Sequence, residues 1–278
     1  MRRDRARFVL IVAVATAALL GTSSCATDDT HATATTAAPT STKGVARLTV
    51  EVLERHPHDT AAFTEGLTFG EDGRLYESLG LDGQSSIREV DPETGKVVRE
   101  NELAADQFGE GITIRAGVIH QLTWKNGVLR TWNADTLEPG SDLTYRGEGW
   151  GLTFDGTSFV QSDGSSRLIV RREDSFDPPT RSIDVTRDGA PVDQLNELEW
   201  VDGVIYANVW HSDEIMRIDP RTGRVTGVID ASELWRDRAR TTEMTLNGIA
   251  HRPGEPADRL WLTGKNWPEM FEVKVVPS

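Results

Sequence analysis

Short stretches in which apolar and polar residues alternate run through this chain, and one of them recurs. Each copy has an apolar residue at its centre, and a glycine usually precedes that residue. The copies are residues 65–69, 110–114, 150–154, 196–200 and 247–251. Successive centres, from Leu67 to Ile249, are 45, 40, 46 and 51 positions apart. Self-similarity at such a spacing indicates a repeat architecture.

Two further apolar segments follow each copy, with turns between them. The second segments are residues 74–79, 118–124, 158–163, 204–210 and 259–265. Some third segments end in a strong turn signal, Asp91-Pro-Glu-Thr-Gly95 or Asp219-Pro-Arg-Thr-Gly223, because Pro presets one backbone angle and Gly accepts a positive one. Each unit is therefore predicted to be a small antiparallel sheet. Five units of about 40 to 50 residues predict an all-β fold, a five-bladed β-propeller.

The last unit offers three strands, at residues 246–252, 260–264 and 270–276. Residues 47–53 alternate as a half-buried strand does. We expect this N-terminal strand to pair with the last blade, which would close the ring and remove an exposed edge.

The repeat also predicts which side chains meet. The innermost strands of a propeller run in one direction, so equivalent starting positions gather at one mouth of the channel, and the second strands end there too. The starting positions are Glu65, Glu110, Trp150, Asn196 and Asn247, and the second-strand ends are Gly80, Trp124, Gly164, Trp210 and Lys265. Aromatic walls with a few convergent polar groups are typical of a small-molecule site. The alternative interpretation is that the tryptophans only wedge the blades together.

The N-terminal segment has the features of an export signal. Four arginines precede an apolar run at residues 8–20, too short for a membrane span but typical of a secretory signal. Cys25, the single cysteine, lies where bacterial lipoprotein precursors are cut and acylated, although Thr22 stands where Leu or Val is usual. Lipidation of Cys25 and simple secretion both remain open, and either places the protein outside the cell or on the outer face of its membrane.

These features divide the chain into a signal peptide at 1–24, a disordered Thr/Ala-rich tether at 25–44 and a propeller domain at 45–278. With one cysteine, no disulfide forms within the chain. The formal net charge is −14, and removing residues 1–24 takes away four Arg and one Asp. Such an acidic domain is poorly suited to nucleic acid or to an anionic lipid surface.

The residues resemble those of a known family, the plant-type glutaminyl-peptide cyclotransferases, also called glutamine cyclotransferases. Matching segments occur in family order at residues 63–67, 80–86, 108–111, 150–152, 161–164, 195–199, 207–210, 246–249 and 263–268. The resemblance implies a five-bladed propeller without cofactor or metal, and an enzyme, an acyltransferase of the aminoacyltransferase type, that converts N-terminal glutamine of peptides to pyroglutamate with release of ammonia.

The resemblance also assigns positions in the pocket. Glu110 falls on the family's essential glutamate. The other pocket positions are Phe63, Phe108, Trp124, Trp150, Asn196, Trp210 and Lys265. Glu65 stands where the family usually has Gln, which alters the charge of the pocket and puts substrate handling in question.

Cyclisation requires a neutral α-amine, whose pKa in free form is about 7.7–8.0, so a base is needed at neutral pH. The hypothesis is that Glu110 takes the amine proton and passes it to the departing ammonia. Lys265, Asn196 or the indole N–H groups would stabilise the amide oxygen as it becomes negative. We expect a monomer that acts on peptides or proteins with N-terminal glutamine.

Two other functions remain open. One is a non-catalytic exported propeller lipoprotein that binds a peptide or a sugar. The other is a lactonase-like hydrolase, in which Glu65, Glu110, Asn196 and Asn247 would hold calcium. His56 and His58 suggest a metal, but two histidines beside a proline in a loop are more often solvated. Retained activity after chelation would separate the cyclotransferase from the hydrolase.

Overall fold

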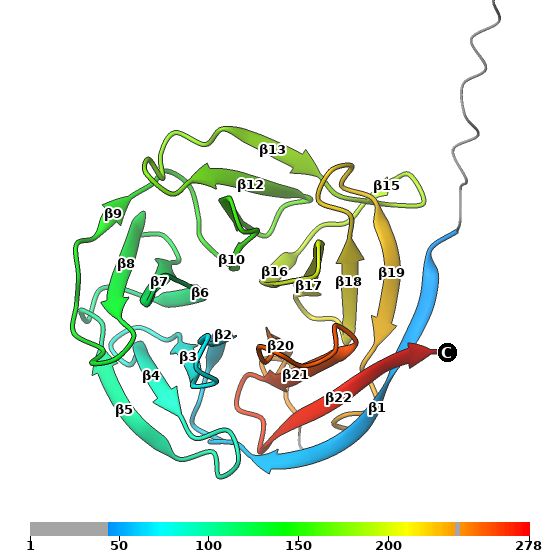
Figure 1. Ribbon diagram of the computed structural model, residues 1–278, viewed down its shortest axis with the longest axis horizontal. Helices are drawn as coiled ribbons and strands as arrows, with labels where there is room; N and C mark the ends of the chain where they lie inside the picture. The colour runs from blue at the N-terminus through cyan, green and yellow to red at the C-terminus, as the bar shows by residue number, and fades with distance from the viewer. Residues whose placement is uncertain (1–43, 237–239) are drawn as a thin grey trace, which may run out of the picture. The chain divides into compact units, whose positions relative to one another are not determined.

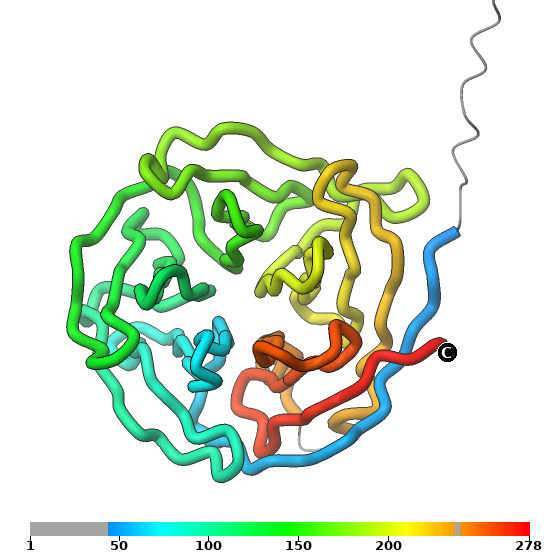
Figure 2. The backbone as a smooth tube through the Cα atoms, in the orientation of Figure 1, coloured from blue at the N-terminus to red at the C-terminus, as the bar shows by residue number. Residues whose placement is uncertain are grey.

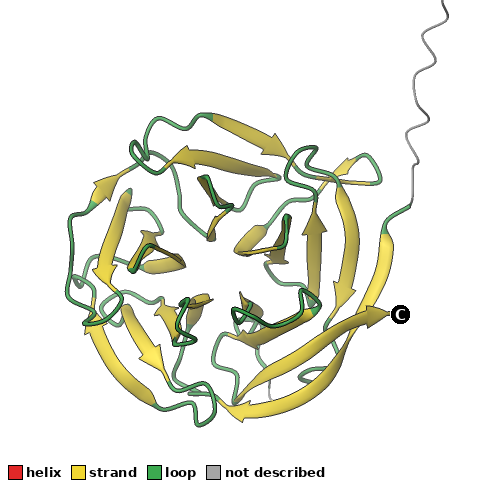
Figure 3. Ribbon diagram, in the orientation of Figure 1, coloured by secondary structure: helices red, strands yellow, loops and turns green. Residues whose placement is uncertain are grey.

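The computed structural model describes residues 44–236 and 240–278. The predicted signal peptide, Cys25 and nearly all of the predicted tether lie outside the described residues. Within them the fold is all-β, with strands and loops throughout (Figure 3). No helix in the described part of the chain has the length and apolar character needed to cross a membrane.

Three four-stranded antiparallel sheets follow one another along the chain. The first contains β2 (Thr64–Phe69), β3 (Leu75–Leu79), β4 (Ser86–Val90) and β5 (Val97–Glu102). The second contains β6 (Gly109–Arg115), β7 (Val118–Thr123), β8 (Val128–Asn133) and β9 (Leu143–Thr144). The third contains β10 (Leu152–Phe154), β11 (Ser158–Gln161), β12 (Arg167–Arg172) and β13 (Arg181–Asp184).

The remaining strands form an eight-stranded sheet, in the order β16-β17-β18-β19-β1-β22-β21-β20, and a short hairpin. The first half contains β16 (Leu195–Val201), β17 (Val204–Val209), β18 (Glu214–Ile218) and β19 (Val225–Asp230). The second half contains β1 (Ala46–Pro57), β22 (Glu269–Pro277), β21 (Arg259–Gly264) and β20 (Leu246–Ala250). The hairpin consists of β14 (Thr186–Arg187) and β15 (Ala190–Pro191).

The prediction that an N-terminal strand pairs with the last unit is confirmed, with a longer strand than expected. Strand β1 runs antiparallel to β22 from the Leu48–Pro277 pair to the Pro57–Glu269 pair. Its first residues also run parallel to β19, which merges two predicted sheets into one. Figure 2 shows the red C-terminal strand running beside the blue N-terminal strand. The closure therefore joins the first strand to two neighbouring units rather than to one.

Five strands, β2, β6, β10, β16 and β20, lie nearest the centre, and each contacts the next in a closed ring (Figure 1). Strand β2 is buried along its whole length, whereas β5 at the rim of the same sheet is largely exposed. The glycine of the repeat explains the tight ring. A Cβ atom at Gly111 would lie 2.5 Å from the Trp150 carbonyl oxygen, so only glycine allows β6 and the chain entering β10 to come this close.

Candidate active site

A pocket of about 220 Å³ opens at one end of the ring of central strands. Its lining residues are Phe63, Glu65, Leu81, Phe108, Glu110, Trp124, Trp150, Asn196, Trp210, Glu243 and Lys265. The structure thus brings together every predicted site residue except Asn247, which lies directly behind Glu65. Side chains from separate units of the repeat therefore lie around one pocket.

The local backbone explains why these side chains converge. The ladder shifts register between Thr64 and Gly66 in β2 and between Gly109 and Ile112 in β6. Equivalent shifts occur at residues 195–198 and 246–249. A bulge leaves an extra residue outside the ladder and redirects its side chain. The same irregularity in four strands therefore redirects the side chains of Glu65, Glu110, Asn196 and Asn247.

A buried ion pair occupies one wall of the pocket. Lys265 Nζ donates to Glu65 Oε1 at 2.6 Å, and Asn247 Nδ2 donates to Glu65 Oε2 at 3.1 Å. Burial raises the pKa of Glu65, and the contacts with Lys265 and Asn247 oppose that rise. The ammonium of Lys265 fills the place that a cation would take beside Glu65. This arrangement argues against the calcium set considered for a lactonase-like hydrolase.

Glu110 is the other buried carboxyl group, with 6% of its surface exposed. Burial raises its pKa well above the ordinary value, and the negative charge of Glu65 adds to the rise. Lys265 lowers that pKa, and Glu148 raises it again. Two carboxyl groups and one ammonium thus share a pocket that excludes much of the solvent, a setting in which Glu110 holds a proton more readily than a free glutamate does.

Aromatic rings form the rest of the wall. Trp150 and Trp210 pack edge to face with ring centroids 5.6 Å apart, and Phe108 packs against Trp124 at 5.6 Å. Lys265 Nζ lies 4.5 Å from the centre of the Phe63 ring. The glycines at the second-strand ends make room for these rings, because a Cβ atom at Gly164 would meet the Trp150 ring at 2.7 Å.

Glu148, which the sequence analysis did not single out, anchors two of the indoles. Its Oε2 accepts hydrogen bonds from Trp124 Nε1 at 2.9 Å and from Trp150 Nε1 at 3.1 Å. In this structure both indole N–H groups donate to Glu148 and are not free to donate to a substrate oxygen. The only sequence signal was its place two residues before Trp150.

Asn196 presents an unused acceptor to the pocket. It is buried, and its Oδ1 has no hydrogen-bond partner in the described structure. A buried polar atom without a partner is costly unless a ligand satisfies it. The side chain is placed to accept a hydrogen bond from an amine or a carboxamide N–H group.

Two further lining residues escaped the sequence analysis. Leu81 follows Gly80 and has a positive φ of 85°, and Glu243 comes from the loop between β19 and β20. Both lie in loops outside the repeat, so the repeat carried no signal for them.

The histidines depart from expectation. His56 and His58 were predicted to be solvated, but both are buried. Glu77 Oε1 lies 2.9 Å from His58 Nε2, and the Trp267 carbonyl oxygen lies 2.8 Å from its Nδ1. Glu77 also accepts from Arg88 Nε at 2.9 Å. His58 thus ties the segment leading to Phe63 and Glu65 to the turn that carries Lys265.

Comparisons with known proteins agree with this geometry. A family model described as glutamine cyclotransferase matches residues 22–275. A glutaminyl-peptide cyclotransferase from Arabidopsis thaliana is 36% identical over 234 residues, which are 81% of this chain and 71% of that protein. The crystal structure of Myxococcus xanthus glutaminyl cyclase superposes with a TM-score of 0.78 at 38% identity, and the match covers 84% of this chain and 99% of that one. An aldose sugar dehydrogenase from Streptomyces coelicolor, at 14% identity and a TM-score of 0.54, shares the fold alone.

Proposed function

The chain belongs to the glutamine cyclotransferase family, and from that premise we propose that it converts N-terminal glutamine of peptides to pyroglutamate without a metal ion. Two relatives that carry this activity in their names match most of the chain. The observation that supports the assignment most directly is the position of Glu110. Its carboxyl group shares an aromatic pocket with the Glu65–Lys265 ion pair.

In the proposed reaction the α-amine nitrogen attacks the side-chain carbonyl carbon of the same glutamine residue. A new carbon–nitrogen bond closes the five-membered ring, and the original amide carbon–nitrogen bond breaks to release ammonia. Glu110 accepts the proton that the amine loses and returns it to the departing nitrogen. A glutamate whose pKa is raised toward that of the amine transfers the proton in both directions at little cost.

Lys265 has the role of stabilising the amide oxygen in this proposal. An ammonium group has three donors, and Glu65 takes one of them. The others are available to an oxygen that gains negative charge, an interaction worth roughly 3–4 kcal/mol for a well-placed donor. Asn196 Oδ1 has the complementary role of accepting a hydrogen bond from the substrate amine or amide. The tryptophan walls hold the glutamine side chain folded toward its own amine.

The number of blades, the oligomeric state and the location of the protein are part of the same proposal. The closed ring of β2, β6, β10, β16 and β20 supports a five-bladed propeller, if the eight-stranded sheet counts as two blades joined through β1. We also propose an exported monomer that Cys25 tethers to the membrane when it is lipidated. Mass spectrometry of the mature N terminus from membrane and secreted fractions would identify either a diacylglyceryl cysteine or an unmodified cleavage product.

The decisive experiment measures ammonia release from a glutaminyl dipeptide by the purified protein, with and without a chelator. We expect turnover in both conditions. The matched variant Glu110→Gln keeps the shape of the side chain but cannot carry the proton, and we expect it to fold normally and lose turnover. Full activity in a folded Glu110→Gln protein would overturn the role of Glu110, and no ammonia from any glutaminyl peptide would overturn the function.

A further inference from the structure

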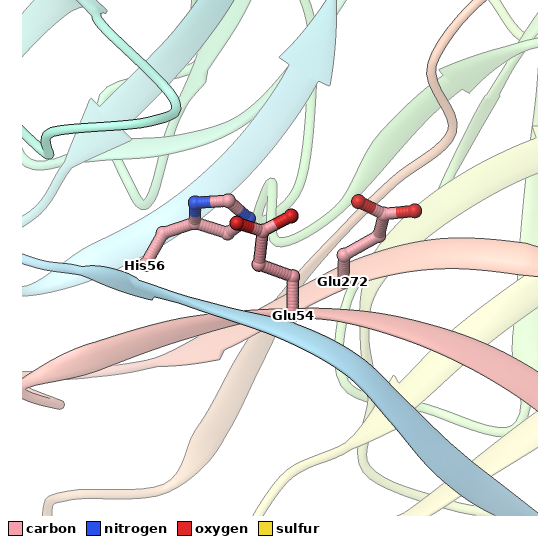
Figure 4. A group of neighbouring side chains, drawn as sticks. All are labelled: Glu54, His56 and Glu272. Atoms are coloured by element: carbon pink, nitrogen blue, oxygen red, sulfur yellow. The ribbon is translucent and has the colours of Figure 1, made fainter.

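Outside the pocket, two carboxylates face each other across the strand pair that closes the ring. Glu54 of β1 pairs directly with Glu272 of β22. Like charges directly opposite each other destabilise an antiparallel pair. His56 lies two residues beyond Glu54, so its side chain is on the same side of β1. Figure 4 shows the imidazole beside the Glu54 carboxylate, with Glu272 next to them.

The histidine is held in one position but incompletely bonded. His56 is 3% exposed and stacks on the Trp261 ring with centroids 4.6 Å apart. Its Nδ1 lies 3.6 Å from Glu93 Oε2, whereas its buried Nε2 has no hydrogen-bond partner in the described residues. A histidine that binds a metal through one nitrogen commonly directs its other N–H group at a carboxylate. His56 matches this arrangement, because Nδ1 faces the Glu93 carboxylate and Nε2 is left for a metal ion.

We propose that Glu54, His56 and Glu272 bind a divalent ion of the zinc type and thereby fasten the first strand of the fold to the last. One ligand atom from each residue lies within 4.8 Å of the others. Zinc–nitrogen and zinc–oxygen bonds are about 2.0–2.2 Å, so the carboxylates must move inward by roughly an ångström. Glu54 is exposed and free to rotate, and its exposure leaves room for water as a fourth ligand.

The surrounding charges suit a cation. Glu93 adds a third carboxylate near the imidazole. Two guanidinium groups oppose them, since Arg259 Nη1 lies 3.3 Å from Glu272 Oε1 and Arg252 Nη1 lies 3.9 Å from Glu93 Oε1. A histidine that binds a metal is neutral. The three carboxylates and two guanidinium groups around it then leave one excess negative charge. Imidazole with carboxylate oxygens is a donor set that zinc accepts.

The site shares no residue with the pocket, so the ion would stabilise the closure and leave the chemistry of the pocket unchanged. An ion that binds only the folded protein raises its melting temperature. The proposal is therefore tested by stability and stoichiometry, and its outcome is independent of the proposed function.

The experiment titrates chelator-treated, dialysed full-length protein with zinc chloride, by calorimetry and by thermal unfolding. We expect one saturable equivalent, and at a hundred times the dissociation constant a rise in melting temperature of roughly 5–10 °C. His56→Gln should abolish both signals. Glu54→Gln, at an exposed position where the fold tolerates change, should weaken binding at least tenfold.

Glu51→Gln is the matched control, because Glu51 lies on the same strand opposite Lys274 and outside the cluster. It should bind zinc as the unaltered protein does. Absence of saturable binding, or equal binding by Glu54→Gln and the unaltered protein, would overturn the proposal. Ammonia release at 25 °C should be the same with and without zinc.

Discussion

Lys265 Nζ and Glu65 Oε1 lie 2.6 Å apart, although the two residues are 200 positions apart in sequence. Both side chains are buried, one at the bulge of β2 and the other just after β21. A buried ion pair seldom adds net stability, because desolvation of both charges offsets their attraction. We therefore infer that this ion pair matters for chemistry rather than for stability. Both of its charges act on the pKa of Glu110 in the same pocket.

Glu65→Gln should move the acidic limb of the kcat/KM profile to lower pH. The negative charge of Glu65 raises the pKa of Glu110, and Lys265 lowers it. Removing the Glu65 charge ends the repulsion and leaves the lysine charge uncompensated, so both changes lower the pKa of Glu110. The acidic limb reports the pKa of the essential base in the free enzyme. At its optimal pH, the Glu65→Gln variant should turn over within about tenfold of the unaltered protein.

Glu65→Gln should lower the stability of the protein without unfolding it, because the carboxamide oxygen can still accept from Lys265 Nζ although the ammonium loses its charge partner. Glu243→Gln serves as the control, because Glu243 lines the same pocket but is not among the groups that shift the pKa of Glu110. A limb that stays in place in Glu65→Gln, or moves to higher pH, would contradict this account.

Lys265→Met should cost both stability and activity, and a second substitution should restore only the former. Breaking a buried ion pair by removing one partner costs roughly 3–5 kcal/mol, because the other charge is left unpaired. Loss of one donor to the amide oxygen should lower kcat by about a hundredfold. In the double variant Glu65→Gln with Lys265→Met the stability should return while kcat stays low.

Urea denaturation and ammonia release, measured on the same preparations, separate the two roles of Lys265. Recovery of kcat together with stability in the double variant would show that the lysine acts only through Glu65.

Glu148→Ala should raise KM by up to about thirtyfold, because its carboxylate holds two indoles and each partly exposed hydrogen bond contributes about 1 kcal/mol. Glu148→Gln keeps an oxygen that can accept from Trp124 and Trp150, so its KM should change by less than about threefold. Steady-state kinetics with a glutaminyl dipeptide provide the measurement. Equal defects in the two variants would show that charge, rather than orientation of the indoles, is what Glu148 supplies.

The sequence predicted the core of the site because the repeat places a bulge at equivalent positions in four of the five central strands, β2, β6, β16 and β20. Glu110 and Asn196 could therefore be brought together without coordinates, and Trp124 and Lys265 could be counted to the ends of second strands. Glu148 and Glu243 belong to connections that differ in length between units. Their approach to the pocket depends on loop paths that no periodicity encodes.

Burial of polar groups was the other point that the sequence did not reveal. His58 was predicted to be solvated because of the neighbouring Pro57, yet it is enclosed through its contact with Glu77. Glu77 is the central residue of β3, whose sequence Leu-Tyr-Glu-Ser-Leu does not show that the whole strand is buried. The partners of Glu77 are His58, Thr64 and Arg88, which lie within 20 residues of it, but no spacing in the sequence shows that their side chains meet.

Glu199→Gln should make the stability of the protein less dependent on pH. Burial raises the pKa of Glu199 from 4.5 to about 8. Between these values the folded state holds a proton that the unfolded chain has released, so stability should fall as pH rises from about 4.5 to 8. The loss should reach the order of a few kcal/mol, since one unit of pKa corresponds to about 1.4 kcal/mol. Glu197, whose pKa burial also raises, contributes with the same sign.

A glutamine at position 199 cannot ionise, but its carbonyl oxygen can still accept the hydrogen bond that Glu199 Oε1 receives from the His251 backbone N–H group. The variant should therefore match the unaltered protein near pH 5 and exceed it at pH 8, with the difference growing across the interval. Urea denaturation at pH 5, 6.5 and 8 measures this difference, and Glu71→Gln at an exposed position is the control. Parallel stability curves for Glu199→Gln and the unaltered protein would mean that Glu199 is ionised in the folded state at neutral pH, and that the hydrogen bond from His251 outweighs the effect of burial.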